Sequence, residues 1–135
     1  MTGQAERGDT NRQPAILIID DDPDVCSMLE FYFENLEYTV HVARSGAAAV
    51  RMVRDDRPDV ILLDVRLPDS DGFTVARTLR ADRYTQHIPI IFLTGRNDPS
   101  DRVEALEIGA DDFVAKPFDA QELRLRIERV LKRER

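Results

Sequence analysis

The stretch AILIIDDDPD, residues 15–24, decides the fold. Its first five residues are apolar and mostly β-branched, which predicts a short strand buried on both faces, as in a parallel sheet. Acids end this strand, and Asp22 followed by Pro23 is typical of a helix N-cap with proline at the first helical position. Apolar residues then recur every three or four positions, which predicts an amphipathic helix over residues 23–36.

The same alternation of short apolar runs and amphipathic segments continues along the chain. We predict further strands over residues 38–43, 59–64, 88–94 and 112–115. Helices are predicted from the Ser45 cap to about residue 54, over 72–81 and 100–108, and from the Asp119 capping box to the end of the chain. Five strand–helix units of this kind predict an α/β fold in which helices cover both faces of a parallel sheet.

Length and charge limit the function classes. The chain has 135 residues and a formal net charge of −7, so we expect one domain at 14–133, preceded by a disordered lead at 1–13. Apolar runs stay far shorter than the roughly 20 residues of a membrane helix. A single cysteine, Cys26, excludes an intrachain disulfide and favours a reduced, cytoplasmic setting. An acidic domain is also a poor binder of nucleic acid, whose phosphates require Lys and Arg.

Polar side chains follow four of the predicted strands. They are Asp20, Asp21 and Asp22 after the first strand, Asp64 after the third, Thr94 after the fourth and Lys116 after the fifth. Parallel strands bring these positions to one edge of the sheet, where ligands of such folds bind. Clustered carboxylates repel one another, and a divalent cation relieves that repulsion; we expect Mg²⁺, with Mn²⁺ as the alternative. A carboxylate at such a site can accept a phosphoryl group, whose oxygens a hydroxyl and an ammonium can hold.

Four motifs carry a resemblance to a known family. IIDDDPDV (18–25), ILLDVRLPDSDG (61–72), IIFLTG (90–95) and GADDFVAKPF (109–118) resemble the receiver domain of bacterial two-component response regulators. The resemblance implies a flavodoxin-like, doubly wound (βα)5 fold with strand order 2-1-3-4-5. It also implies a phosphoprotein that takes its phosphoryl group from a sensor histidine kinase or a histidine phosphotransfer protein, as in a phosphorelay. Such a domain catalyses only its own phosphorylation and slow dephosphorylation.

The resemblance gives roles to the residues at the strand ends. Asp64 matches the aspartate that is phosphorylated, Asp21 the direct metal ligand and Asp20 the acid that holds a metal-bound water. The backbone carbonyl of Arg66 matches the remaining protein ligand of the metal. In the pair Lys116–Pro117, the lysine matches the residue that binds the phosphoryl oxygens, and the proline follows a peptide bond that is usually cis in the family.

Further residues match the switch and the surroundings of the phosphoryl group. Thr94 resembles the hydroxyl that turns toward the phosphoryl group, and Phe113 the aromatic that moves inward with it. Arg66 and Arg96 each lie two residues after a site residue, and the resemblance implies that side chains at these positions flank the route of the attacking water. Two guanidiniums there predict a long-lived phosphoryl state, because they can cover the phosphoryl oxygens. The alternative is that they pair with acids nearby, at Asp69, Asp71 or Asp98, and have no kinetic effect.

The end of the chain suggests an interface. In one large receiver subgroup, the fourth helix, the fifth strand and the last helix form a two-fold dimer through salt bridges. The charges that resemble this set are Arg102, Asp111, Asp112, Glu122 and Arg126. A self-complementary patch needs both signs, and this one has them. The alternative is a solvated basic helix face.

Other functions fit the sequence less well. A phosphatase that forms an aspartyl phosphate needs an acid two residues after the nucleophile, where this chain has Arg66. If the chain were an unphosphorylated pseudo-receiver that only binds partners, the acid pair would be incomplete or the lysine would be missing. Here both the acid pair and the lysine are present. A nucleotide-binding module of the usual kind needs a glycine-rich loop after the first strand. Both a stand-alone receiver and a domain of a larger regulator fit the sequence.

Overall fold

The computed structural model describes residues 13–95 and 99–133. Within them the strands are β1 (Ala15–Ile19), β2 (Thr39–Ala43), β3 (Val60–Asp64), β4 (Ile90–Thr94) and β5 (Asp112–Ala115). The helices are α2 (Pro23–Glu34), α3 (Gly46–Asp56), α4 (Gly72–Ala81), α5 (Pro99–Ile108) and α6 (Ala120–Arg133). All strand pairs are parallel and the order is β2-β1-β3-β4-β5, so the flavodoxin-like α/β prediction is confirmed. The predicted lead lies, apart from Gln13, outside the described residues.

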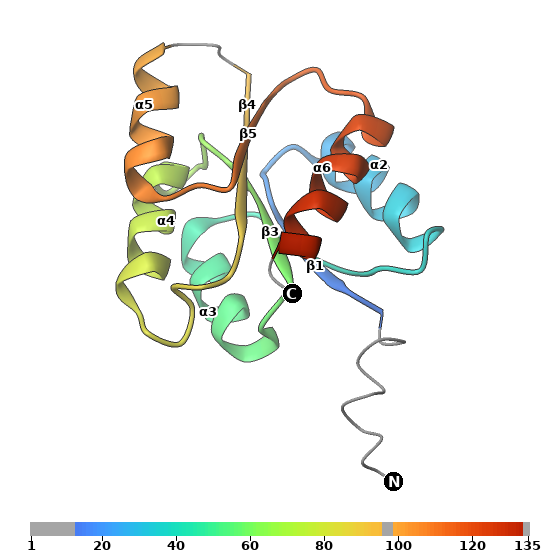
Figure 1. The fold of residues 1–135 in the computed structure, drawn as a ribbon, viewed down its shortest axis with the longest axis horizontal. Coiled ribbons are helices and arrows are strands. Elements are labelled where there is room, and N and C mark those ends of the chain that lie inside the picture. The colour runs from blue at the N-terminus through green and yellow to red at the C-terminus, as the bar shows by residue number, and fades with distance from the viewer. Residues whose placement is uncertain (1–12, 96–98, 134–135) are drawn as a thin grey trace, which may run out of the picture.

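Two apolar layers cover the sheet. α3, α4 and α5 pack on one face, while α2 and α6 pack on the other (Figure 1). Every residue of β3 and β4 is buried, which explains why these strands read as continuous apolar runs. Among the described residues, none of the helices has both the length and the apolar character needed to cross a bilayer.

Some element boundaries differ from the predictions by two residues. α2 ends at Glu34 rather than at residue 36, because the chain tightens there into a turn. α3 extends to Asp56, two residues past the predicted end, and stops at Arg57 in the left-handed region (φ 47°). β4 begins at Ile90, two residues later than predicted. These differences leave the strand ends that carry the polar residues where they were predicted.

Two aspartates fix the loop that follows β3. The Asp69 carboxylate accepts hydrogen bonds from the backbone N–H groups of Gly46 at 2.8 Å and Ala47 at 3.1 Å, at the start of α3. These bonds hold the pKa of Asp69 below its usual value. Asp71 caps α4 in the same way, accepting from the N–H of Thr74 at 2.8 Å. The loop directly after the third strand is therefore held by two helix N-termini.

We expect Asp69→Ala to lower the melting temperature at neutral pH by roughly 2–4 °C, because two N–H groups of α3 lose their acceptor. The Asp69 pKa is lowered by folding, so its contribution is complete above about pH 4 and is lost as the pH falls through the folded value. Thermal melts across this range measure the effect, with Asp55→Ala, an exposed acid of the same helix, as control. A difference between variant and wild type that stays constant into strong acid would contradict this role.

Candidate functional site

The strand register brings the predicted site residues to one edge of the sheet. Asp64, the last residue of β3, lies opposite Leu93, and Thr94, the last residue of β4, lies opposite Ala115. Lys116 follows directly, and its N–H donates to the carbonyl of Thr94 at 2.6 Å. The chain positions that sequence analysis selected are therefore neighbours in space.

A lysine lies between two buried carboxylates at this edge. The Lys116 ammonium is 2.8 Å from Oδ2 of Asp20 and 3.3 Å from Oδ2 of Asp64. Asp20 is completely buried, and Asp64 is only 7% exposed. Burial alone would lower the pKa of Lys116, but the hydrogen bond and charge of Asp20 and the charge of Asp64 outweigh it and raise that pKa. The lysine therefore stays charged and compensates the acids.

The environment of Asp64 works against its charge. Burial raises its pKa, and the neighbouring charge of Asp20 raises it further. The backbone N–H of Arg66, which donates to Oδ1 at 3.2 Å, and the charge of Lys116 both act in the opposite direction. The net result is a raised pKa, so this carboxylate gains from any further positive charge that approaches it.

Three acids converge on one point. Carboxylate oxygens of Asp20, Asp21 and Asp64 all lie within 4.8 Å of one another. An ion such as Mg²⁺ would draw these oxygens closer together, or one of the acids would act through a bound water. Asp20 and Asp64 are buried while Asp21 is exposed, which leaves one side of the group open to water. The oxygen-only donor set and its open side suit a hard cation that keeps several waters.

Gly72 lets α4 begin directly against the third strand. A Cβ at this position would lie 2.2 Å from the backbone oxygen of Asp64, closer than real Cβ contacts allow. The N–H of Gly72 donates to the carbonyl of Val65 at 2.6 Å. The sequence marked Gly72 only as the start of a helix; the pair Asp71–Gly72, a cap followed by a residue without a side chain, is the signal of this close approach.

Thr94 and Phe113 lie on the same side of the sheet as α5. The side chain of Thr94 is buried, and that of Phe113 is half-buried at the edge strand. The Phe113 ring lies 6.5 Å from the Phe92 ring, between centroids, and the Arg102 guanidinium lies 5.1 Å above it. The aromatic is therefore between the interior and the surface, covered by a side chain of α5.

The charges of the predicted dimer face pair within the chain. Arg126 of α6 bonds Asp112 and Glu122, each at 2.9 Å. Asp111 lies 3.4 Å from Arg80 of α4 and 3.7 Å from Arg133 of α6. Arg102 is the fifth member of the predicted set and covers Phe113. These charges are thus engaged in the single chain, whatever they do in an assembly.

Sequence analysis missed exposed apolar residues on the same two helices. Val103 and Leu106 of α5 are 54% and 75% exposed, and Leu125 of α6 is 53% exposed. On α5 the buried positions are Asp101 and Ala105, so the larger side chains point outward. The sequence did contain a signal for this exposure. The large apolar residues of this helix do not recur on the helix face that is buried against the sheet.

Other predictions have mixed outcomes. Asp22 caps α2 as predicted, and the Lys116–Pro117 bond is cis. Arg66 is exposed, and the carboxylates of Asp69 and Asp71 are engaged by backbone N–H groups instead of by its side chain. Arg96 and Asp98 lie outside the described residues, so the predictions about them have no structural counterpart.

Comparison with known sequences gives one consistent family. The model of the response regulator receiver domain matches residues 16–128. The transcriptional regulatory protein AfsQ1 of Streptomyces coelicolor is 44% identical over 120 residues, which are 89% of this chain and 52% of that protein. The DNA-binding response regulator MtrA of Mycolicibacterium smegmatis is 43% identical over 125 residues, 93% of this chain and 53% of that protein. The chain thus spans about half the length of the curated relatives it matches.

Solved structures agree with the sequences. The receiver domain of the sensor histidine kinase PA1611 of Pseudomonas aeruginosa, with a magnesium ion coordinated in its active-site cleft, superposes with a TM-score of 0.82 at 35% identity. That match covers 90% of this chain and 99% of the other. The non-phosphorylated HemR receiver domain of Leptospira biflexa gives a TM-score of 0.81 at 33% identity, covering 88% and 94%.

Proposed function

This chain belongs to the family of response regulator receiver domains, and we propose that its Asp64 accepts a phosphoryl group from a sensor histidine kinase or a histidine phosphotransfer protein. The observation that carries the proposal is the Lys116 ammonium between Asp20 and Asp64, at the edge where parallel strands end. A pseudo-receiver that acts unphosphorylated would not need this arrangement intact. We assign the domain to residues 14–133 and its place of action to the cytoplasm.

Phosphoryl transfer from the donor histidine to Asp64 would be an in-line displacement at phosphorus. A carboxylate oxygen of Asp64 attacks the phosphorus, a P–O bond forms, and the P–N bond to the donor imidazole breaks. The imidazole keeps the electron pair of that bond and leaves as a neutral histidine after taking up a proton. Lys116 then exchanges its contact with Asp64 for a phosphoryl oxygen, and Thr94 donates its hydroxyl hydrogen to another. Hydrolysis by water later returns the Asp64 carboxylate and releases inorganic phosphate; we propose no activity on other substrates.

Mg²⁺, or Mn²⁺ in its place, belongs to this proposal. Asp21, Asp64 and the Arg66 carbonyl would hold the ion, which when bound neutralises charge on the phosphoryl oxygens. Asp20 would act through a water, and its contacts support this: Oδ1 accepts from the Asp22 N–H at 3.0 Å and Oδ2 from Lys116 at 2.8 Å. Asp21, which is exposed, can approach an ion directly.

Phosphorylation would change the surface formed by α5, β5 and α6. We propose that Thr94 turns toward the phosphoryl group and that Phe113 moves into the space it leaves. The half-buried ring supports this, because part of it already lies in the interior. Arg102 would then lose the ring it covers. The two states differ in side-chain packing, which is the condition for a population shift.

A dimer through this surface is the readout that we propose. The exposed Val103, Leu106 and Leu125 would provide the apolar area that is buried between the two chains. The charged residues around Arg126 would fix how the two chains are aligned. This domain itself would not contact nucleic acid, because it is acidic overall. Any DNA-binding output, as the name of MtrA states for that relative, would belong to another part of a longer protein.

We expect incubation with acetyl phosphate and Mg²⁺ to add one phosphoryl group to the chain, measured by intact mass. Asp64→Asn should abolish the gain, and Asp55→Asn, an exposed acid far from the site, should keep it. Asp21→Ala should reduce the rate by roughly tenfold or more and weaken Mg²⁺ binding measured separately. A phosphoryl group that persists on Asp64→Asn would mean that another residue is the acceptor.

We expect Arg66 and Arg96 to slow hydrolysis. The double variant Arg66→Asn/Arg96→Asn should lose its phosphoryl group several-fold faster than wild type, because less positive charge covers the phosphoryl oxygens. Decay of the phosphorylated mass after removal of the donor measures the rate. Arg83→Asn, an exposed arginine elsewhere, controls for charge loss. Equal decay rates in the double variant and wild type would refute the kinetic role.

We expect phosphorylation to increase the dimer fraction in sedimentation velocity. Leu106→Asp should keep the chain monomeric after phosphorylation, because it puts a charge in the proposed apolar centre without touching the acceptor site. Phe31→Asp, a similarly exposed apolar residue on α2, is the matched control and should dimerise like wild type. Loss of dimerisation in both variants, or in neither, would exclude this face.

A further inference from the structure

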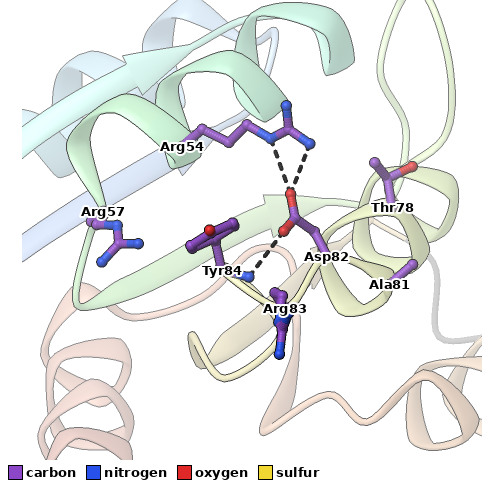
Figure 2. Close-up of a pocket in the computed structure, with 7 residues that line it drawn as sticks. All are labelled: Arg54, Arg57, Thr78, Ala81, Asp82, Arg83 and Tyr84. Atoms are coloured by element: carbon purple, nitrogen blue, oxygen red, sulfur yellow. Dashed lines mark hydrogen bonds and ion pairs between the residues drawn. The ribbon is translucent and has the colours of Figure 1, made fainter.

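An open cavity of about 770 Å³ lies where α3 and α4 end (Figure 2). Arg54 and Arg57 line it from the end of α3, Thr78 from α4, and Asp82, Arg83 and Tyr84 from the chain that follows α4. α4 begins beside Asp64 and ends at this cavity, so the helix separates the two places. Nothing in the proposed phosphorylation uses these residues.

The lining is cationic although the whole chain is acidic. Three arginines, Arg54, Arg57 and Arg83, and a single acid, Asp82, line the cavity. Arg54 already neutralises Asp82, with Nη2 at 2.8 Å and Nε at 3.0 Å from Oδ2. Arg54 also has an ordinary structural role, because it lies in the last turn of α3, where a cation complements the helix dipole. The positive charge that remains available comes from Arg57 and Arg83.

These two arginines lie beyond the helix ends. Arg57 is the left-handed residue that stops α3, and Arg83 follows the residue that caps α4. Both are exposed, and over residues 13–95 and 99–133 neither forms an ion pair. The oxygens of Asp82 accept from Arg54 and from the N–H of Tyr84 at 2.9 Å. Over the described residues, these two guanidiniums beside the cavity therefore have no carboxylate partner that an anionic ligand would have to displace.

An aromatic ring stands beside them. Tyr84 is 64% exposed, a large value for this residue type, and the Arg57 guanidinium lies 5.8 Å from its ring centroid. Figure 2 shows the ring between Arg57 and Asp82, at the side of the cavity. A planar ligand group can stack on such a ring, while guanidiniums bond a phosphate bidentately.

We propose that this cavity binds a nucleoside phosphate, with the base against Tyr84 and the phosphate on Arg57 and Arg83. The cavity is open to solvent, so a bound nucleotide would keep part of its surface exposed and would be held by the ring and the two guanidiniums. An acidic peptide would be favoured by cations spread along a groove, whereas these line one cavity beside an exposed aromatic ring. Such a site needs no glycine-rich loop, because side chains rather than backbone N–H groups hold the phosphate.

Calorimetric titration of the full chain with adenosine monophosphate tests the proposal. EDTA is present throughout, and Asp64→Asn is titrated in parallel, so that binding at the acidic edge is recognised. We expect one ligand per chain in both proteins. Adenosine alone and inorganic phosphate alone should each bind at least about tenfold more weakly, because each keeps only one of the two contacts.

Variants locate the binding. Arg57→Gln and Arg83→Gln should each weaken it by about tenfold, and Tyr84→Ala by a similar factor, while Tyr84→Phe keeps it. Arg51→Gln removes the same charge from an exposed position of α3 outside the cavity and should leave affinity unchanged. Circular dichroism of each variant checks folding.

Three outcomes would overturn the proposal. They are absence of heat at about 1 mM ligand, an equal loss in Arg51→Gln and Arg83→Gln, and binding of a glutamate-rich peptide but not of the nucleotide. Asp64 phosphorylation by acetyl phosphate is measured separately, so failure here would leave the receiver function intact.

Discussion

The ion pair between Lys116 and Asp20 is the contact on which the acidic edge depends. The two residues are 96 positions apart in sequence, and their strands are separated in the sheet by β3 and β4. Asp20 is completely buried, and an uncompensated charge there would cost several kcal/mol. Lys116 removes that cost and lies over the end of β3 while doing so. The same contact that makes buried acids tolerable therefore places an ammonium beside Asp64.

Much of this edge could be predicted because strand ends are readable in sequence. Apolar runs that stop at an acid, a threonine or a lysine give the positions, and parallel pairing brings them together. Contacts between loops and distant helices could not be predicted. No residue near Asp69 in the sequence indicates that its carboxylate accepts hydrogen bonds from the N–H groups of Gly46 and Ala47. The outward direction of Leu106 likewise depends on how α5 is rotated against its neighbours.

The charged residues of the proposed dimer face limit what they can contribute. Arg126 already holds Asp112 and Glu122 within the chain, so an intersubunit bridge would replace an existing contact rather than add one. Exposed pairs of this kind contribute little free energy even when they form anew. The apolar residues of α5 and α6 lose water on association and break nothing. Affinity would therefore come from those residues, and orientation from the charges.

Helix direction explains why the two ends of the molecule differ in charge. α2, α3 and α4 begin at the edge where Asp64 lies, and their N-termini favour negative charge, both of the capping acids and of a phosphoryl group. α3 and α4 end at the opposite edge, where helix C-termini favour cations such as Arg54. One edge thus gathers acids that need a cation, while the other carries Arg54, Arg57 and Arg83 beside Asp55, Asp56 and Asp82. Arg54 complements the C-terminus of α3 and pairs with Asp82, whereas Arg57 and Arg83 do neither. These two guanidiniums are therefore the ones that we propose hold an anion.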